Sequence, residues 1–186
     1  NDIHVNAGGT LKGTGTVNNL YIAANGTVAP GHSPGCLNSA NLVENGTYQA
    51  ELGGTTACTE YDQVKVTGTV DLSSGTLSVI RYNNYAPAAG NTYTIIDNDG
   101  TDAVTGTFNN LAEGATFTLD NGTVMSISYK GGDGNDVVLT VQNTPATPDT
   151  GLAAITSHPM ITLAATLVSA SVLLGLARSR RLLGNR

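Results

Sequence analysis

Few side chains in this sequence could take part in acid–base or nucleophilic chemistry. The three histidines are His4, His32 and His158, and His32 stands beside the hydroxyl of Ser33. Adjacent residues rarely reach the geometry in which a base takes a hydroxyl proton, and no third group is marked to orient the base. The prolines and glycines of 30–35 indicate a fixed turn instead. We therefore predict that no residue is catalytic and that the protein is not an enzyme.

Two acidic stretches have spacings that resemble calcium loops. The first, 97–102, fails the EF-hand pattern because glycine stands at its fourth position and Phe108 at its twelfth. The second, 131–138, matches one copy of a nonapeptide calcium repeat, in which Asp133 and Asp136 would be ligands. A single copy cannot form the stacked turns that share each ion. We expect solvated turns, no metal and no cofactor, with Asp133 and Asp136 as residual calcium candidates.

The residues around the second acidic stretch alternate between apolar and polar types. Met125, Ile127 and Tyr129 alternate with polar residues, and Val137, Leu139 and Val141 follow the same period on the other side. A period of two predicts β-strands. We expect a hairpin with a glycine-rich loop that caps the open end of a larger β-structure.

A short phrase of glycine, threonine and an apolar residue recurs along the chain. Its copies begin at Gly9, Gly15, Gly26, Gly46, Gly68, Gly75, Gly106 and Gly122. The step from Gly26 to Gly46 is 20 residues and the step from Gly46 to Gly68 is 22 residues, lengths that suit one coil of a β-solenoid. We expect glycine to provide positive φ at the corners and Thr or Val to begin the next strand. A β-sandwich with strands about every 8 to 12 residues is the competing architecture.

Cys36 and Cys58 are the only two cysteines and lie 22 residues apart. This separation equals one predicted coil, so stacking of consecutive coils would bring the two thiols together. In an exported protein an even pair of cysteines indicates a disulfide. We predict a Cys36–Cys58 disulfide worth roughly 3 kcal/mol of stability. The alternative is a pair of buried free thiols.

The turn at 28–37 reads Val-Ala-Pro-Gly-His-Ser-Pro-Gly-Cys-Leu, and further motifs follow at 61–72, 106–108 and 129–139. Together these stretches resemble autotransporter-like β-helical repeat proteins over most of residues 8–141. The resemblance implies that the fold is all-β, a right-handed parallel β-helix. No catalytic residue accompanies these motifs in that family.

Charge is divided unevenly along the chain. All fourteen acidic residues lie at or before Asp149, and the basic residues in the same part are Lys12, Lys65, Arg81 and Lys130. The other four basic residues are Arg178, Arg180, Arg181 and Arg186. Nucleic acids bind proteins through clustered Lys and Arg. The acidic part of the chain therefore predicts no nucleic-acid partner.

The C-terminal stretch combines three features in a fixed order. The motif Thr147-Pro148-Asp149-Thr150-Gly151 is followed by the mostly apolar segment 152–177 and by the basic tail 178–186. This order resembles the cell-wall sorting signal of sortase-anchored (LPxTG-type) surface proteins, with Thr147 in place of the usual leucine. The resemblance implies that a sortase cysteine attacks the carbonyl of Thr150 and breaks its bond to Gly151. Thr150 would then pass to an amine of peptidoglycan.

The stretch from Met160 to Ala177 is an uncharged run of eighteen residues. As a helix rising ~1.5 Å per residue it would cover roughly 27 Å, slightly less than the ~30 Å hydrocarbon core of a membrane. The arginines that follow would stay on the cytoplasmic side and leave the preceding part of the chain outside. We predict a transmembrane segment within 152–177 and a cytoplasmic tail at 178–186, with a buried C-terminal helix as the alternative.

These features predict a β-helical surface domain at 1–141 and an extended Pro/Thr linker at 142–150. The chain starts at Asn1 without a signal peptide, so we expect it to be the C-terminal part of a longer exported protein. We expect a non-catalytic stalk or adhesin that is inserted in the membrane and then anchored to a Gram-positive-type cell wall. Its partners would be sortase and peptidoglycan, and its surface ligand is open.

Two alternative functions follow from the same sequence. One is a polysaccharide-active β-helix enzyme, which would need clustered acids beside basic groups. The scattered basic residues of the acidic part make this alternative less attractive. The other is a surface protein that keeps its C-terminal segment and remains in the membrane uncleaved.

Overall fold

The structure is a computed structural model that describes residues 1–142, and these residues form two β-sheets. Sheet A consists of β1 (Ile3–Val5), β3 (Gly15–Ile22), β5 (Cys36–Glu44), β7 (Gln63–Val66), β8 (Val70–Asp71), β10 (Thr92–Asn98), β11 (Thr116–Thr118), β12 (Val124–Gly131) and β13 (Asp136–Val141). Sheet B consists of β2 (Thr10–Gly13), β4 (Thr27–Pro30), β6 (Thr47–Leu52) and β9 (Thr76–Arg81). The helical structure of the described residues is the short 3-10 turn η1 (Tyr82–Asn84). The predicted all-β class is confirmed.

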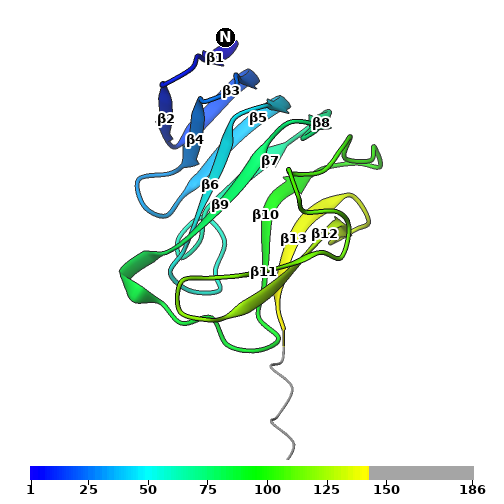
Figure 1. Ribbon diagram of the computed structural model, residues 1–186. Helices are drawn as coiled ribbons and strands as arrows, with labels where there is room; N and C mark the ends of the chain where they lie inside the picture. Colours follow the sequence, from blue (N-terminus) through cyan, green and yellow to red (C-terminus); the bar gives the residue numbers. More distant parts are fainter. Residues whose placement is uncertain (143–186) are drawn as a thin grey trace, which may run out of the picture. The chain divides into compact units, whose positions relative to one another are not determined.

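Apart from β8, which follows β7 within sheet A, the chain alternates between the two sheets as it advances from β1 to β10. The strands β1, β3, β5, β7 and β10 pair in parallel in sheet A, and β2, β4, β6 and β9 pair in parallel in sheet B. Parallel neighbours need a crossover between them, and here each crossover contributes a strand to the opposite sheet. Figure 1 shows the resulting stack, with β1 and β2 at one end and β10, β13 and β12 toward the other.

The Gly-Thr phrases of four crossovers lie in register in sheet B. The paired threonines are Thr10 with Thr27, Thr27 with Thr47 and Thr47 with Thr76. Each later threonine donates its amide to the glycine carbonyl one coil earlier, in the pairs Thr27–Gly9, Thr47–Gly26 and Thr76–Gly46. The expected positive φ is not found at Gly26, Gly46 or Gly75. Glycine is needed there because a Cβ would collide with the backbone of the neighbouring corner.

The steps between stacked corners are less regular than the sequence indicates. The turns at Gly26 and Gly46, 20 residues apart, are neighbours in sheet B, because Thr27 pairs with Thr47. The next corner in the stack is Gly75 and not Gly68, because Thr47 pairs with Thr76. The loop 53–62 follows β6 and lengthens this coil. Gly68 instead packs against the carbonyl of Ala40 at a turn between strands of sheet A.

Inward-facing side chains form continuous columns between the two sheets. Leu20, Leu42 and Val70 follow one another in register from β3, β5 and β8, and each is at most 1% exposed. Tyr48 reaches across from sheet B, is fully buried and donates its hydroxyl to the carbonyl of Ile95 at 2.6 Å. The inward side chains of each strand therefore cover those of the neighbouring strands.

Sheet A changes from parallel to antiparallel pairing after β10. β10 pairs with β13, β13 with β12 and β12 with β11, all in antiparallel order. The predicted hairpin is confirmed, with Met125 opposite Val141 and Ile127 opposite Leu139. The apolar side chains that the period of two predicts are all buried: Met125, Ile127, Tyr129, Val137, Leu139 and Val141. Asn135 and Asp136 at the loop end of the hairpin are buried as well.

The predicted C-terminal segments fall beyond the part of the chain that the structure describes. They are the linker after Gln142, the sorting motif, the apolar segment 152–177 and the basic tail 178–186. Within residues 1–142, no helix has the length and apolar character needed to span a bilayer.

Replacing Gly46 with alanine is expected to destabilise the stack. The new Cβ would lie 2.6 Å from the carbonyl oxygen of Ala23 and would also contact the carbonyl of Gly26, and neither backbone atom can rotate away. We expect the free energy of unfolding to fall by about 2 kcal/mol or more. Gly122→Ala is the control, because its Cβ meets no atom within 4 Å and its φ is 86°, so it carries only a conformational cost of about 1 kcal/mol. Equal losses in urea denaturation would contradict this explanation.

Candidate functional site

The residues singled out from the sequence fall into two groups. The sorting motif Thr147–Gly151 and the four tail arginines lie outside the described residues. The cysteines, the calcium candidates and the His32–Ser33 pair lie within them. His32 is exposed, and Ser33 has a φ of 77° in the turn at 28–37. This pair therefore belongs to a tight turn on the surface of the domain formed by residues 1–142.

The predicted disulfide between Cys36 and Cys58 is present. The two Cα atoms are 4.7 Å apart. The spacing argument for this disulfide was wrong, however. The residue that pairs with Cys36 in the neighbouring strand is Gln63 and not Cys58. Cys58 lies in the loop 53–62, where it has a φ of 67°. The disulfide therefore fastens the loop 53–62 to the first residue of β5.

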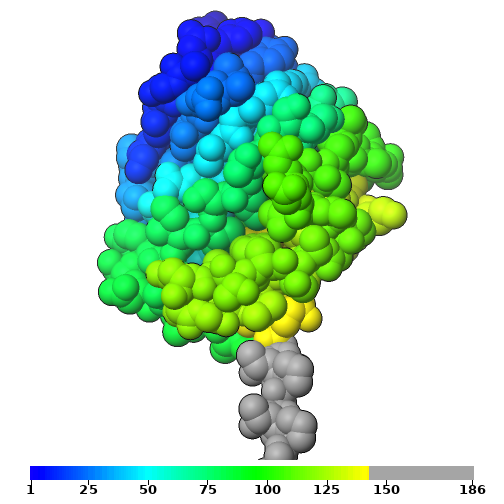
Figure 2. Space-filling model, in the orientation of Figure 1, coloured from blue at the N-terminus to red at the C-terminus, as the bar shows by residue number. Residues whose placement is uncertain are grey.

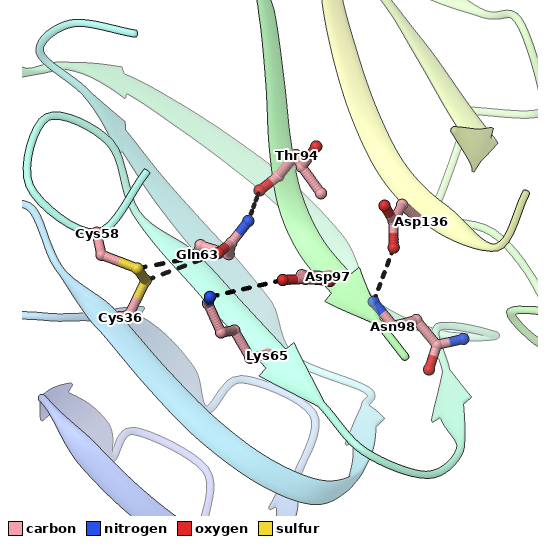
Figure 3. A network of polar contacts seen from close by, with 8 residues as sticks. All are labelled: Cys36, Cys58, Gln63, Lys65, Thr94, Asp97, Asn98 and Asp136. Atoms are coloured by element: carbon pink, nitrogen blue, oxygen red, sulfur yellow. Dashed lines mark hydrogen bonds and ion pairs between the residues drawn. A yellow bond between two sulfur atoms is a disulfide. The ribbon is translucent and has the colours of Figure 1, made fainter. Parts of the chain in front are cut away.

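Gln63 connects the disulfide to the next strand of sheet A (Figure 3). Its side-chain amide donates to the carbonyl of Thr94 in β10 at 2.8 Å. Its Oε1 atom lies 3.9 Å from the sulfur atoms of Cys36 and Cys58. These are packing contacts, because the sulfur atoms of a disulfide carry no hydrogen. Gln63 is 4% exposed, so the network holds three strands together from within.

Two further contacts in Figure 3 join β7, β10 and β13. Lys65 and Asp97 form an ion pair at 3.7 Å, and both side chains are more than 40% exposed. An exposed pair of this kind contributes little stability. The carboxylate of Asp136 accepts the amide of Asn98 at 2.9 Å. This bond lies where the parallel part of sheet A meets its antiparallel part.

Asp62 fastens the turn at 28–37 to sheet B. One of its oxygens accepts the amide of Gly35 at 2.8 Å and the other accepts the amide of Glu51 at 2.9 Å. The side chain is fully buried, and this burial raises the pKa of Asp62 to about 7, although the two amide donors oppose the rise. Asp62 thus links the motifs at 28–37 and 61–72, since the second supplies the acceptor for an amide of the first.

Glu44 closes a corner that is shorter than its neighbours. In sheet A, Val5, Ile22 and Glu44 occupy one inward column. Three residues lie between Val5 and Gly9 and between Ile22 and Gly26, but only one lies between Glu44 and Gly46. In the longer corners the glycine amide donates to a carbonyl three residues earlier, in the pairs Gly9–Asn6 and Gly26–Ala23. In the short corner this carbonyl is replaced by Glu44 Oε1, which accepts the Gly46 amide at 2.8 Å.

The environment of Glu44 favours its neutral form. The residue is fully buried, and Oε2 has no hydrogen-bond partner among residues 1–142. Burial raises the pKa of Glu44 from 4.5 to about 8, and the Gly46 amide opposes this rise only in part. The sequence reasoning missed both Glu44 and Asp62. A usable signal was present for Glu44, which occupies an inward position of an alternating strand where an apolar residue is expected.

The two acidic stretches that resembled calcium loops lie side by side. The side-chain amide of Asn135 donates to the carbonyls of Asp99 and Asp102, at 3.3 and 3.1 Å. The side-chain amide of Asn98 also donates to Asp102, at 2.8 Å. The backbone carbonyls of Asp99 and Asp102 are therefore hydrogen-bonded to asparagine side chains. Within residues 1–142, no three His, Cys, Asp or Glu side chains are grouped so that they could hold a metal ion.

A groove of about 340 Å³ lies between β9 and the segment that contains β11. Its apolar lining includes Leu77, Val79 and Phe117. At one end, Arg81 binds the carboxylate of Asp120 through two nitrogen atoms, and this ion pair lowers the pKa of Asp120. Figure 2 shows this side of the body, with the segment around residue 115 in yellow-green. Asn109, Asn110, Thr118 and Asp120 also line the groove, so it offers both an apolar surface and polar groups.

We compared the sequence with known protein families and with curated proteins. A scan against protein-family models and a search of curated proteins each found no match to this chain.

Removal of the disulfide is expected to lower the free energy of unfolding by roughly 3 kcal/mol, because the unfolded chain regains the freedom of the closed loop. The variant is Cys36→Ser combined with Cys58→Ser, and thermal unfolding is the measurement. The unsubstituted chain in reductant should show the same loss. Iodoacetamide without reductant should label neither cysteine, and quantitative labelling of both would contradict the bond.

The stability of the chain is expected to fall as the pH rises from about 5 to 8. Between these values the folded chain keeps the proton of Glu44 (pKa about 8), while the unfolded chain has lost it. The unfolded state then binds fewer protons, so the free energy of unfolding decreases with pH, by a few kcal/mol in total. Asp62, with a pKa of about 7, adds to this loss.

Glu44→Gln should flatten this pH dependence, because glutamine retains an acceptor for the Gly46 amide and cannot ionise. The measurement is urea denaturation at pH 5, 6.5 and 8. Asp133→Asn is the matched control, since it removes an exposed carboxylate and should leave the slope unchanged. An unaltered slope in Glu44→Gln would show that Glu44 is ionised in the folded chain.

Proposed function

We propose that this protein is a non-catalytic cell-surface protein that sortase anchors to peptidoglycan. The observation that carries the proposal is the order of the C-terminal sequence, in which Thr147–Gly151 precedes an uncharged run and four arginines. The uncharged run would hold the chain in the membrane, and the arginines would keep its end in the cytoplasm. The acidic part of the chain would then lie outside.

The anchoring reaction proceeds in two steps that conserve the number of amide bonds. The thiolate of the sortase attacks the carbonyl carbon of Thr150, and the bond to Gly151 breaks as the amine of Gly151 leaves with a proton. An amine of the peptidoglycan then attacks the thioester and releases the thiolate. Gly151 suits the leaving position because it has no side chain to obstruct the enzyme.

The described body suits a stalk or adhesive module. We take it to be a right-handed parallel β-helix with the β12–β13 hairpin as its cap. Strands that alternate between two parallel sheets and inward columns that run through successive coils support this fold. The Cys36–Cys58 disulfide supports an oxidising environment, in which such bonds persist. The lack of a convergent acid–base pair in the groove between β9 and β11 favours binding over catalysis.

Wall attachment through Thr150 can be tested in a Gram-positive host that secretes this chain. Muramidase digestion should release a form whose C-terminal peptide ends at Thr150 and carries the mass of a wall peptide. Thr150→Ala should shift most of the protein to the membrane fraction, because the attacked residue has changed. Thr147→Leu, which restores the usual motif, should keep or increase the wall-linked fraction. Intact Arg186 throughout the membrane fraction of the unsubstituted chain would overturn the proposal in favour of an uncleaved membrane protein.

A further inference from the structure

The outer edge of β9 has no strand paired to it in residues 1–142. Thr76 donates its amide to Gly46, so this residue faces β6. In a parallel ladder the N–H and C=O of one residue point to the same side, and successive residues alternate. The backbone groups of Leu77, Val79 and Arg81 therefore point away from β6. They form a row of donors and acceptors along the edge of sheet B.

The next coil begins to occupy this edge and then leaves it. The amide of Asn109 donates to the carbonyl of Gly75 at 2.7 Å, and its side chain donates to Ser74. This is the bond that a following strand would make first. At Asn110 the chain turns away, with a φ of 61°, and Leu111 donates back to Phe108. The position beside Leu77, Val79 and Arg81 is left without a strand.

The groove between β9 and β11 lies at this position. Leu77 and Val79 are in register with Tyr48 and Ala50, which are fully buried, so they continue inward columns of the core. They are nevertheless only partly buried, because no coil covers them. Phe117 forms part of the opposite wall. A strand placed here would cover two core side chains that the described coils leave accessible.

The charges of the groove restrict what can enter it. Arg81 is compensated by Asp120 and also donates to the carbonyls of Asn84 and Tyr85. No other charged side chain lines this groove. An occupant gains nothing from a net charge on its inward side, and burying an unpaired charge there would be costly.

We propose that the edge of β9 binds an extended segment of a partner protein by β-strand addition. Backbone pairing with Leu77, Val79 and Arg81 would hold the segment, and uncharged apolar side chains at alternate positions would fill the groove. A polypeptide is favoured over a sugar because donors and acceptors repeat along the edge at strand spacing. The inference does not depend on how the chain is anchored, since it rests on β6, β9 and residues 109–120 and not on the C-terminal sequence.

The test uses the full chain in mild detergent and a fluorescein-labelled peptide of sequence Lys-Thr-Val-Thr-Leu-Thr-Val-Thr-Lys. We expect saturable binding by fluorescence anisotropy. A peptide with the same side chains and N-methyl groups on all its central amides should bind about tenfold more weakly or not at all, because neither of its edges can donate to β9. Equal binding of the two peptides would overturn strand addition.

Val79→Pro is the decisive variant, because it removes an N–H that points away from β6 and leaves the β6 ladder intact. It should weaken peptide binding about tenfold. Val79→Thr, which keeps the N–H and a similar shape, should change binding less than about threefold. Ile80→Ser changes the outward face of the same strand and should leave binding unchanged. Circular dichroism establishes that each variant is folded.

Three results would overturn the proposal. The first is the absence of saturable peptide binding to the unsubstituted chain. The second is a Val79→Pro variant that is folded and binds as the unsubstituted chain does. The third is a concentration-dependent dimer, seen by light scattering, that Val79→Pro abolishes, because the edge would then pair with a second copy of this chain and not with a partner.

Discussion

The distance between successive corners constrains most of this structure. Neighbouring strands lie about 4.7–4.9 Å apart, so each corner must sit directly against the one before it. The corner threonines donate to the glycine carbonyl one coil earlier, and a side chain on Gly26 or Gly46 would collide with that backbone. Once these bonds fix the register, the apolar residue after each threonine must point inward. Val28 and Tyr48 therefore fall into one column and build the core coil by coil.

Departures from a regular coil are accommodated by buried polar groups. Where a corner is too short to bond its own glycine amide, Glu44 supplies the acceptor. Where a long loop follows β6, Asp62 and the Cys36–Cys58 disulfide attach it to the preceding turn. A buried carboxyl group is costly unless it is hydrogen-bonded or neutral. The raised pKa values of Glu44 and Asp62 are the consequence, because both acids are held where water cannot solvate the charge.

The two sheets stop at different places along the stack. Sheet A continues through the antiparallel strands β13, β12 and β11, whereas sheet B stops at β9 within the described residues. The difference follows from one turn, at Asn110, where the chain leaves the stack after a single bond to Gly75. Unpaired strand edges are points at which proteins recruit further strands. In the proposed surface protein, the partner segment would bind at the edge of β9, where the parallel pairing of sheet B ends.

The sequence by itself determined the features that depend on local spacing. The Gly-Thr phrases predicted turns that lead into strands, the period of two predicted the hairpin of β12 and β13, and the paired cysteines predicted their disulfide. The tertiary structure decided which corners stack, since the loop 53–62 moves the partner of Gly46 from Gly68 to Gly75. It also decided the roles of Glu44, Asp62 and the edge of β9. These three features depend on contacts between residues that are far apart in the sequence. The spacing of neighbouring residues therefore could not predict them.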